Sequence, residues 1–514
     1  MIAFRAVGLV PPNATGLVAA LLLQAALALA GGPAVAASAG QGTSPGGAGD
    51  AAAQTAAPAV PQPVAGWIAA TAASPAKIGL IAIPVAGGAP LIEWNAMQAL
   101  NPASTMKLLS TYVALTTLGP DYRWVTTAHL DGRLNQGVLE GNLVLRGGGD
   151  PKLVVEDVTE FVARMRAAGL REIRGNLIID DSLFDLRADN GLPLDGDASQ
   201  PYNVGPHAAL MNFKSVRVVV KPAGDKVRIA LDPPLADVRV VNELKVAQGA
   251  CQPGAMSLWI RDGAPASDAR TGTATAAVRV GGQYAPACGE QGIYAAVLNH
   301  REFIHGFFKA AWLAAGGVFS GRTLLEAGAA SRLPVWQQWV SPRSLAEIAQ
   351  DINKFSNNVM TRQVLLGASA SVEGPGSPER VRHLVDDWLA RRGLRFPELV
   401  IDNGSGLSRE ERISARSLAD LLVHAANAAH ADLFRITMPQ VGIDGTMRAR
   451  LQRHPLAGRA WIKTGSLRDV KSIAGYVDTA SGRRYAVVML INGDKILGAQ
   501  PAQDAFLRWV YENG

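Results

Sequence analysis

The feature that most constrains the fold is a set of short apolar runs placed at the two ends of the chain. Near the start, residues 77–85 and 91–96 are separated by a turn rich in Gly and Pro. Near the C-terminus, three similar runs follow one another, at residues 460–467, 471–480 and 483–493. Apolar, β-branched runs bounded by turn residues are typical of strands. We expect these five to form one antiparallel sheet, so that the first and last parts of the chain make a single domain.

The rest of the 514-residue chain predicts an α+β protein of two or three domains. From Tyr122 to about Asn299, strand-like runs dominate, with one clear helix near residues 156–168. Apolar residues at helical spacing close the chain at residues 502–511. Four further stretches have helical periodicity: residues 301–317, 341–369, 378–393 and 414–429. We interpret the middle as a β-rich insert within a domain that has both a sheet and helices.

The N-terminal segment has the composition of an export signal. The apolar run at residues 17–30 follows Arg5 and precedes small residues that fit a cleavage site. A membrane anchor is the alternative, but the run is shorter than the ~20 residues that a spanning helix needs, and it contains Gln24. We expect residues 1–36 to be a signal peptide and residues 37–66, mostly Ala, Gly, Pro, Ser, Thr and Gln, to be a disordered linker. No later run predicts a transmembrane segment in the mature chain.

The charge, the cysteines and the absence of metal-binding motifs exclude some classes of function. The formal net charge of +6 is mild for this length, and no basic cluster interleaved with aromatic residues supports nucleic-acid binding. There are two cysteines, Cys251 and Cys288, and in an oxidising compartment one disulfide is the first expectation, with two buried free thiols as the alternative. No CxxC pair and no HExxH occurs, so nothing predicts a metal site.

The stretch NPASTMKLLSTYVAL, residues 101–115, places Ser104 and Lys107 three positions apart at the start of an apolar run. On a helix, such residues share a face, so the lysine could take the proton of the serine if burial lowered its pKa. An N-capping serine beside a solvated lysine is the alternative. A second copy of the pattern, Ser74 to Lys77, runs directly into a strand, and we expect no helical turn there to join its ends.

Two further motifs favour a catalytic interpretation. Ser356, Asn357 and Asn358 form an S-x-N motif, which alone could be a helix cap. Residues 463–465 form a K-T-G motif at the end of a predicted strand, which alone could be an edge strand with a solvated lysine. The order S-x-x-K, S-x-N, K-T-G matches the signature of serine β-lactamases and penicillin-binding proteins.

The sequence resembles the class C low-molecular-mass penicillin-binding proteins, the D-alanyl-D-alanine carboxypeptidase/endopeptidases of the bacterial envelope. Ser104 lies 252 residues before Ser356, an interval that this family fills with two nested insert domains. The resemblance covers roughly Trp67 to Tyr511 and includes GNLVLRGGGDPKL, QPYNVGPHAALMNF and IDNGSGLSREERIS. It implies a transpeptidase-like domain with a five-stranded antiparallel sheet flanked by helices. The expected divisions are a catalytic domain (67–122 and 300–514), insert domain II (123–210 and 291–299) and insert domain III (211–290).

The resemblance also implies roles for the motif residues. Ser104 would be the acylated nucleophile and Lys107 its proton acceptor, Ser356 would relay a proton to the leaving D-alanine, and Asn358 would orient the acyl amide. The remaining residues would bind the substrate: Lys463 and Thr464 its terminal carboxylate, Gly465 by allowing close approach to the strand, and the backbone N–H groups of Ser104 and Ser466 its oxyanion. No cofactor is implied.

Substrate selection rests on three other residues. The acidic residue and the tyrosine that approach diaminopimelate in relatives fit Asp197 and Tyr202, and a solvated loop acid and a packed tyrosine are the alternative. Arg409 matches a basic residue near that pocket in relatives, while a surface arginine is the other interpretation.

We therefore predict an exported, periplasmic, penicillin-binding hydrolase. It would remove the terminal D-alanine from peptidoglycan stem peptides or cut D-alanyl-diaminopimelate cross-links, through an acyl-serine that β-lactam antibiotics also form. A serine β-lactamase or esterase on the same scaffold, and a non-catalytic peptidoglycan-binding protein, are the alternatives. A homo-oligomer is left open.

Overall fold

The computed structural model describes residues 60–514 apart from residues 61, 63, 72, 188–195, 225, 253–255, 268–273, 495 and 497. The expected signal peptide and most of the expected linker lie outside the described residues. Helix α2 (Val64–Ala69) begins within the last residues assigned to that linker, and its Val64 and Ile68 are buried.

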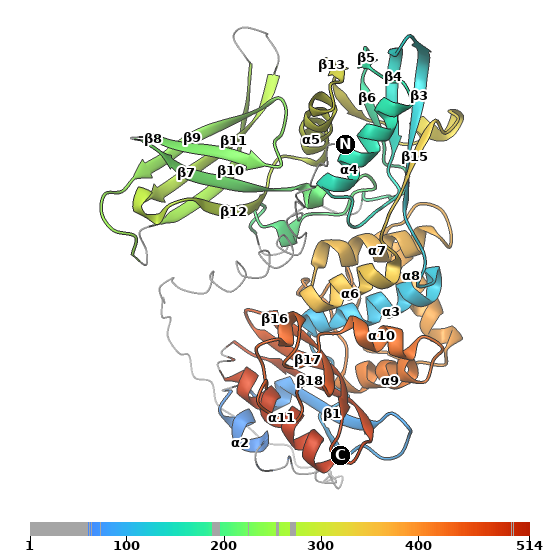
Figure 1. Cartoon of the computed structure of the whole chain (residues 1–514). Coiled ribbons are helices and arrows are strands. Elements are labelled where there is room, and N and C mark those ends of the chain that lie inside the picture. The colour runs from blue at the N-terminus through green and yellow to red at the C-terminus, as the bar shows by residue number, and fades with distance from the viewer. Residues whose placement is uncertain are drawn as a thin grey trace, which may run out of the picture.

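The two ends of the chain form one five-stranded antiparallel sheet, which confirms the prediction (Figure 1). The strand order is β16-β17-β18-β1-β2. The strands are β1 (Ile78–Pro84), β2 (Ile92–Trp94), β16 (Ala460–Leu467), β17 (Val470–Asp478) and β18 (Arg484–Asn492). Strand β1 pairs with β18 over its whole length, so the N-terminal part of the chain is held by its C-terminal part.

Both faces of this sheet are covered by helices. On one face, Leu80 packs in a cluster with residues of α2 and of the terminal helix α11 (Ala499–Asn513). On the other face, Ile81 packs in a larger cluster with the helical layer. That layer consists of α3 (Lys107–Leu118), α6 (Leu345–Phe355), α7 (Asn358–Ala370), α8 (Pro378–Arg391), α9 (Ala415–Ala426) and α10 (Ala431–Thr437). Burial on both faces explains why these strands read as continuous apolar runs.

A second, seven-stranded sheet lies above the helical layer in Figure 1. Its strands are β3 (Val125–Asn135), β4 (Val138–Arg146), β5 (Glu172–Ile173), β6 (Leu177–Asp180), β13 (Val318–Phe319), β14 (Thr323–Leu325) and β15 (Gln337–Val340). Helices α4 (Val155–Ala167) and α5 (His300–Ala314) pack their apolar faces into the same cluster as this sheet.

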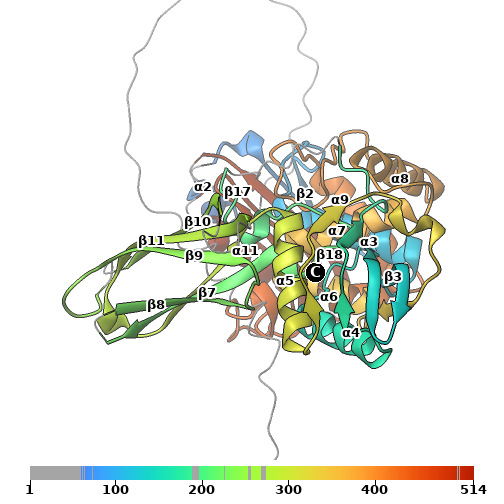
Figure 2. The ribbon, with the colours of Figure 1, turned by 90° about the horizontal axis from the view of Figure 1, so that it is seen from above.

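Two three-stranded sheets form an arm that projects from the rest of the molecule (Figure 2). One has the order β12-β7-β8 and the other β10-β11-β9. The strands are β7 (Ser215–Ala223), β8 (Lys226–Asp232), β9 (Val238–Val246), β10 (Ser257–Ser267), β11 (Ala274–Tyr284) and β12 (Gln291–Ala296). Cys251 and Cys288 form a disulfide in this arm, which confirms the pairing expected from the sequence.

Two of the expected domain boundaries do not coincide with the limits of the sheets and cores in the structure. Residues 291–299 were assigned to insert domain II, but β12 pairs with β7 in the arm. Residues from 300 onwards were assigned to the catalytic domain, but Phe303 of α5 and Trp339 of β15 pack in the core of the seven-stranded sheet. The sequence reveals that a segment is a strand or an amphipathic helix, but not which of several apolar faces it covers. We therefore propose that the middle unit extends to Val340.

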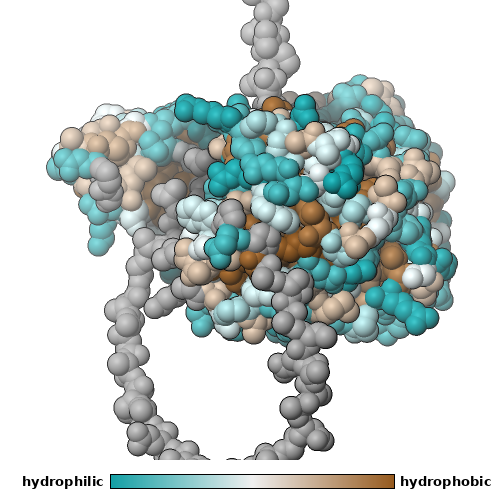
Figure 3. Space-filling view, turned by 90° about the horizontal axis from the view of Figure 1, so that it is seen from below, coloured by the Kyte–Doolittle hydropathy of each residue, from teal (hydrophilic) through white to brown (hydrophobic). Residues whose placement is uncertain are grey.

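At the end of the molecule that carries the C-terminus, hydrophilic and hydrophobic residues are mixed along the rim, and the most hydrophobic residues gather near the middle of the face (Figure 3). Within the described ranges, every helix is too short or too polar to cross a lipid bilayer.

Candidate active site

Ser104 and Lys107 meet where a short turn leads into a helix. The 3-10 turn η3 (Ala103–Met106) continues directly into α3, and Lys107 Nζ lies 2.9 Å from Ser104 Oγ. Lys107 is fully buried, whereas Ser104 is partly exposed. A substrate can therefore reach the hydroxyl while solvent does not reach the amine, which is the arrangement that a nucleophile and its base require.

The ammonium of Lys107 has three hydrogen-bond acceptors. Besides Ser104 Oγ, Nζ donates to Asn358 Oδ1 at 2.7 Å and makes a close hydrogen bond with the backbone carbonyl of Ser405. A neutral amine has only two N–H groups and one lone pair. If Asn358 and Ser405 accept the two N–H groups, the lone pair points at the Ser104 hydroxyl, ready to take its proton.

The electrostatic setting favours the neutral amine. Burial lowers the pKa of Lys107 from 10.5 to about 7, while the negative charge of Glu411 acts in the opposite direction. A base whose pKa lies near the working pH is both unprotonated often enough and basic enough to accept a proton. Lys107 therefore has the properties of a general base near neutral pH.

The S-x-N motif lies at a break between two helices. Helix α6 ends at Phe355, the next residue, Ser356, adopts a left-handed conformation with φ of 60°, and α7 begins at Asn358. Asn357 caps α7, since its side chain accepts a hydrogen bond from the backbone N–H of Met360 at 2.9 Å. The three residues thus have separate tasks: Asn357 starts the second helix, and the side chains of Ser356 and Asn358 contact the two lysines.

The lysine of the K-T-G motif reaches the same cluster from the edge strand β16. Lys463 is fully buried, and its Nζ donates to Ser356 Oγ at 3.0 Å and to the carbonyl of Thr464 at 2.7 Å. Burial, and then the charge of Lys107, hold the pKa of Lys463 well below its usual value. The side chain of Thr464 hydrogen-bonds to that of Thr446 at 2.8 Å. Ser466 is exposed, and its hydroxyl accepts from Lys471 at 3.0 Å.

Gly465 lets β16 pack directly against the turn that carries Ser104. A Cβ at this position would lie 2.1 Å from Ser472 Oγ, 2.8 Å from the carbonyl oxygen of Pro102 and 2.9 Å from the backbone nitrogen of Ser104. Such distances are too short for any side chain. The glycine was expected to give a substrate room against the strand, whereas the contacts show that it makes room for the nucleophile's own turn.

The loop at residues 403–406 covers Lys107 from the other side. Its Gly404 carbonyl accepts from Ser110 at 2.6 Å, and a Cβ at Gly406 would lie 1.9 Å from the carbonyl oxygen of Ala103. The buried Glu411 accepts from the backbone N–H groups of Gly404 at 2.6 Å and Asn403 at 3.2 Å.

Sequence reasoning missed Glu411 and the Ser405 carbonyl. Glu411 stands beside Glu410 in a polar stretch, and nothing in the local sequence indicates which of the two is buried. A backbone carbonyl has no sequence signal at all.

Of the three specificity residues, Tyr202 contacts the cluster. It lies in the 3-10 turn η4 (Pro201–Asn203), and its backbone carbonyl accepts from Asn358 Nδ2 at 3.4 Å. Asp197 is exposed, and its carboxylate accepts from Ser199 at 2.7 and 2.9 Å and from Gln200 at 2.9 Å. Burial acts to raise the pKa of Asp197, but these hydrogen bonds prevail and lower it.

Arg409 lies at the surface. Its guanidinium forms an ion pair of 2.5 Å with Asp469, and both side chains are 42% exposed. Because Asp469 stands in the turn between β16 and β17, this ion pair ties the 403–411 segment to the strand that carries Lys463.

The second S-x-x-K copy differs from its prediction in one respect. Residues Pro75–Lys77 do form a 3-10 turn, although no helical turn was expected before the strand. Proline at the first position favours such a turn. Ser74 and Lys77 are nevertheless exposed. This copy of the motif therefore lacks the burial that lowers the pKa of Lys107.

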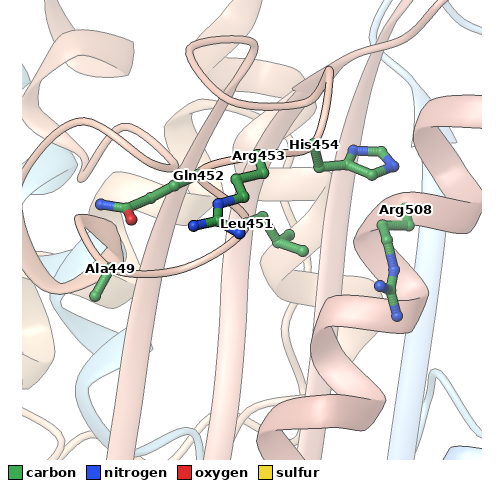
Figure 4. A pocket seen from close by; sticks show the side chains of 6 residues that line it. All are labelled: Ala449, Leu451, Gln452, Arg453, His454 and Arg508. Carbon is green, nitrogen blue, oxygen red and sulfur yellow. The ribbon is translucent and has the colours of Figure 1, made fainter.

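A hollow of about 500 Å³ lies elsewhere, between the loop before β16 and helix α11 (Figure 4). It is lined by Ala449, Leu451, Gln452, Arg453, His454 and Arg508. None of these side chains contacts Ser104, Lys107 or Lys463, so the chemistry described above does not take place there.

Residues 62–511 match the D-Ala-D-Ala carboxypeptidase 3 (S13) family. The D-alanyl-D-alanine carboxypeptidase DacB of Haemophilus influenzae is 26% identical over 431 residues, which are 81% of this chain and 85% of that protein. A D-alanyl-D-alanine carboxypeptidase of Actinomadura sp. is 26% identical over 447 residues, 83% of this chain and 80% of that protein.

Among solved structures, penicillin binding protein 4 (dacB) from Haemophilus influenzae is similar, with a TM-score of 0.71 and 23% sequence identity. The match covers 85% of this chain and 96% of that one. The two proteins therefore share their fold over nearly the whole of the smaller chain.

Proposed function

This chain belongs to the D-Ala-D-Ala carboxypeptidase 3 (S13) family and is a serine-type carboxypeptidase, and we propose that Ser104 is its nucleophile and Lys107 its general base. The observation that carries this assignment is the position of Lys107 Nζ, buried and 2.9 Å from Ser104 Oγ. Membership of an enzyme family sets aside the non-catalytic alternative.

In the acylation step, Ser104 Oγ bonds to the carbonyl carbon of the penultimate D-alanine while its proton passes to Lys107. The bond from that carbon to the nitrogen of the terminal D-alanine then breaks, and the nitrogen takes a proton through Ser356. The Lys463–Ser356 hydrogen bond of 3.0 Å supports this relay, because it keeps the hydroxyl in contact with a proton donor. Water then attacks the ester carbon and gives a proton back to Ser356 and Lys463, while Lys107 returns its proton to Ser104 Oγ as the ester bond breaks, so that each cycle consumes one water molecule.

The backbone N–H groups of Ser104 and Ser466 form the proposed oxyanion hole. The close approach of β16 to the Ser104 turn at Gly465 supports this pairing. One preorganised donor of this kind is worth roughly 3 kcal/mol of transition-state stabilisation. Lys463 and Thr464 bind the terminal carboxylate, and Asn358 orients the amide of the acyl group in addition to holding Lys107.

The proposed substrates are peptidoglycan stem peptides that end in D-alanyl-D-alanine, together with D-alanyl-diaminopimelate cross-links. Asp197 and Tyr202 approach the amino end of the diaminopimelate side chain, and Arg409 lies near that pocket. The hydrogen bond between Asn358 and the Tyr202 carbonyl supports this arrangement, because it links the Asp197 segment to the catalytic residues.

β-Lactams acylate the same serine in our proposal. A solved structure of the Haemophilus influenzae protein contains a β-lactam, and its fold matches that of this chain with a TM-score of 0.70. The rival serine β-lactamase activity is tested with a fluorescent penicillin: we expect a labelled band that persists, and its disappearance within seconds would favour the lactamase.

We place the enzyme outside the cytoplasm, in the periplasm, because the apolar run at residues 17–30 resembles an export signal. Detection of the protein with an antibody in the periplasmic, membrane and cytoplasmic fractions of a culture tests this. Recovery in the cytoplasmic fraction would contradict it.

The experiment that tests the function is mass spectrometry of muropeptides digested with wild type and with Ser104→Ala. Wild type should release D-alanine from pentapeptides and cleave cross-linked dimers, and the variant should do neither. Ser74→Ala, at the exposed copy of the motif, serves as the matched control and should behave as wild type. Undiminished release by the Ser104 variant would contradict the proposal.

A further inference from the structure

Glu411 is a buried carboxyl that the steps above do not use. It is completely shielded from solvent, and its Oε1 accepts the N–H groups of Gly404 and Asn403. Its Oε2 has no hydrogen-bond partner in the part of the chain that the structure describes. Burying a carboxyl costs free energy, and leaving one oxygen without a partner costs more. Such a group calls for a compensating role.

The loop that Glu411 holds is the loop that contacts the base. The carbonyl of Ser405, next to Gly404 in the chain, accepts a hydrogen bond from Lys107 Nζ. The carbonyl of Gly404 itself is fixed by Ser110, on the same helix as Lys107. Glu411 is therefore two hydrogen bonds away from the amine that faces Ser104.

The charged groups around Glu411 are few. Lys107 on α3 and Asp402 on the adjoining segment act on it, and Lys107 in turn acts on Lys463 of β16. Arg412 directs its guanidinium to the backbone carbonyls of Arg409 and Glu411, while Arg409 pairs with Asp469 at the surface. Glu410 is exposed.

Burial raises the pKa of Glu411 to about 7, with Asp402 adding to the rise and the backbone N–H groups and Lys107 opposing it. The pKa of Lys107 is also about 7, and the charge of Glu411 is what raises it against burial. The two groups therefore change protonation in the same pH range, and each influences the other.

We propose that Glu411 is a positioning residue for acylation, which holds the Asn403–Gly406 loop against Lys107 and supplies the buried negative charge that sets the pH at which Lys107 accepts the Ser104 proton. This inference rests on the proposed function of Ser104 and Lys107.

The sign of the effect follows from the charges. A negative carboxylate stabilises the ammonium of Lys107, so it keeps the base protonated up to a higher pH. Removing the charge should let Lys107 lose its proton at lower pH. The charge acts only in the pH range in which Glu411 is itself ionised, around pH 7 and above, so its effect on the rate is largest there and fades at lower pH.

The test is the pH dependence of the second-order rate of acylation by a fluorescent penicillin, measured for wild type and for Glu411→Gln between pH 5 and 9. The amide keeps an oxygen for the loop N–H groups but has no charge. We expect the Gln variant to reach its maximal rate at lower pH than wild type, with the difference greatest near pH 7, while Glu410→Gln retains the wild-type limb.

An unmoved limb, whether or not the maximal rate falls, would overturn the role of the charge, because a purely structural contact lowers the rate without changing its pH dependence. If the Gln variant does not fold, Glu411→Asp supplies the answer, since its shorter side chain withdraws the carboxylate and should move the limb in the same direction by a smaller amount. An unmoved limb there would also overturn the proposal. Labelling of wild type at Ser104 in the same assay separates these outcomes from a failure of the proposed function.

Discussion

Lys463 Nζ lies 3.0 Å from Ser356 Oγ, and this hydrogen bond joins residues that are 107 positions apart in the chain. It brings the edge strand of the sheet onto the break between α6 and α7, where Asn358 meets Lys107 at 2.7 Å. The three sequence motifs thus meet at this break: hydrogen bonds join Lys107 to Ser104 and to Asn358, and another joins Lys463 to Ser356.

Replacing Lys107 with alanine should reduce penicillin acylation by a factor on the order of 10²–10⁴, the usual contribution of a general base. The fold should persist, because alanine is the best helix former and the position lies at the start of α3. The measurement is the labelling rate of Lys107→Ala alongside Lys77→Ala, the exposed lysine of the second S-x-x-K copy. Labelling of the Lys107 variant at the wild-type rate would remove it as the base.

Replacing Gly465 with alanine should impair acylation by displacing the Ser104 turn. The new Cβ would press on Ser472 Oγ, on the Pro102 carbonyl and on the Ser104 nitrogen, and overpacking of this kind costs about 1–3 kcal/mol. Gly66→Ala, in helix α2 with nothing within 4 Å of the added Cβ, is the matched control. The melting temperature and the labelling rate should both fall for Gly465→Ala, and neither should fall for Gly66→Ala. A Gly465 variant as active as wild type would mean that the strand does not fix the nucleophile.

Replacing Asp197 with asparagine should slow turnover of diaminopimelate peptides more than of lysine peptides. The amide oxygen can still accept both hydrogen bonds from Ser199, which hold the turn, while the hydrogen bond from Gln200 and the charge are lost. The ratio of kcat/KM for the two peptide classes is the measurement. Equal losses on both would exclude Asp197 from the specificity pocket.

Removing the disulfide should destabilise the arm without affecting acylation. Cys251 and Cys288 are 37 residues apart, and closing a loop of that length is worth about 4 kcal/mol in the chain-entropy model. The variant Cys251→Ser/Cys288→Ser should melt earlier and be cut sooner by protease between β9 and β12. Its labelling by penicillin should match wild type, since the arm projects away from the sheet that carries Lys463 (Figure 1). Loss of labelling would show that the arm supports the active site.

The five-stranded sheet could be predicted because each of its strands is visible in the local sequence, and because all five lie at the two ends of the chain. Residues such as Ile81 and Val488 stand in continuous apolar runs bounded by turns, and those runs became strands paired with each other. The family and the class of enzyme followed from three motifs in a fixed order, and the match to residues 62–511 confirms that identification.

The sequence could not predict which core each helix joins or which charged side chains become buried. The apolar face of α5 had more than one core available, and only the structure shows that Phe303 packs in the core that the seven-stranded sheet shares with the arm, and not in that of the five-stranded sheet. Glu410 and Glu411 are identical in local context, yet one is exposed and the other is buried beside the base. Burial of a charged group depends on distant segments, and it is these segments that change the pKa of Lys107.

The most direct test of the central claim is peptide mapping of the protein after brief reaction with penicillin. We predict that the added mass appears on the peptide that contains Ser104, and that it is absent from the Ser104→Ala and Lys107→Ala variants. A penicilloyl group on any other residue, or undiminished labelling of either variant, would contradict the account.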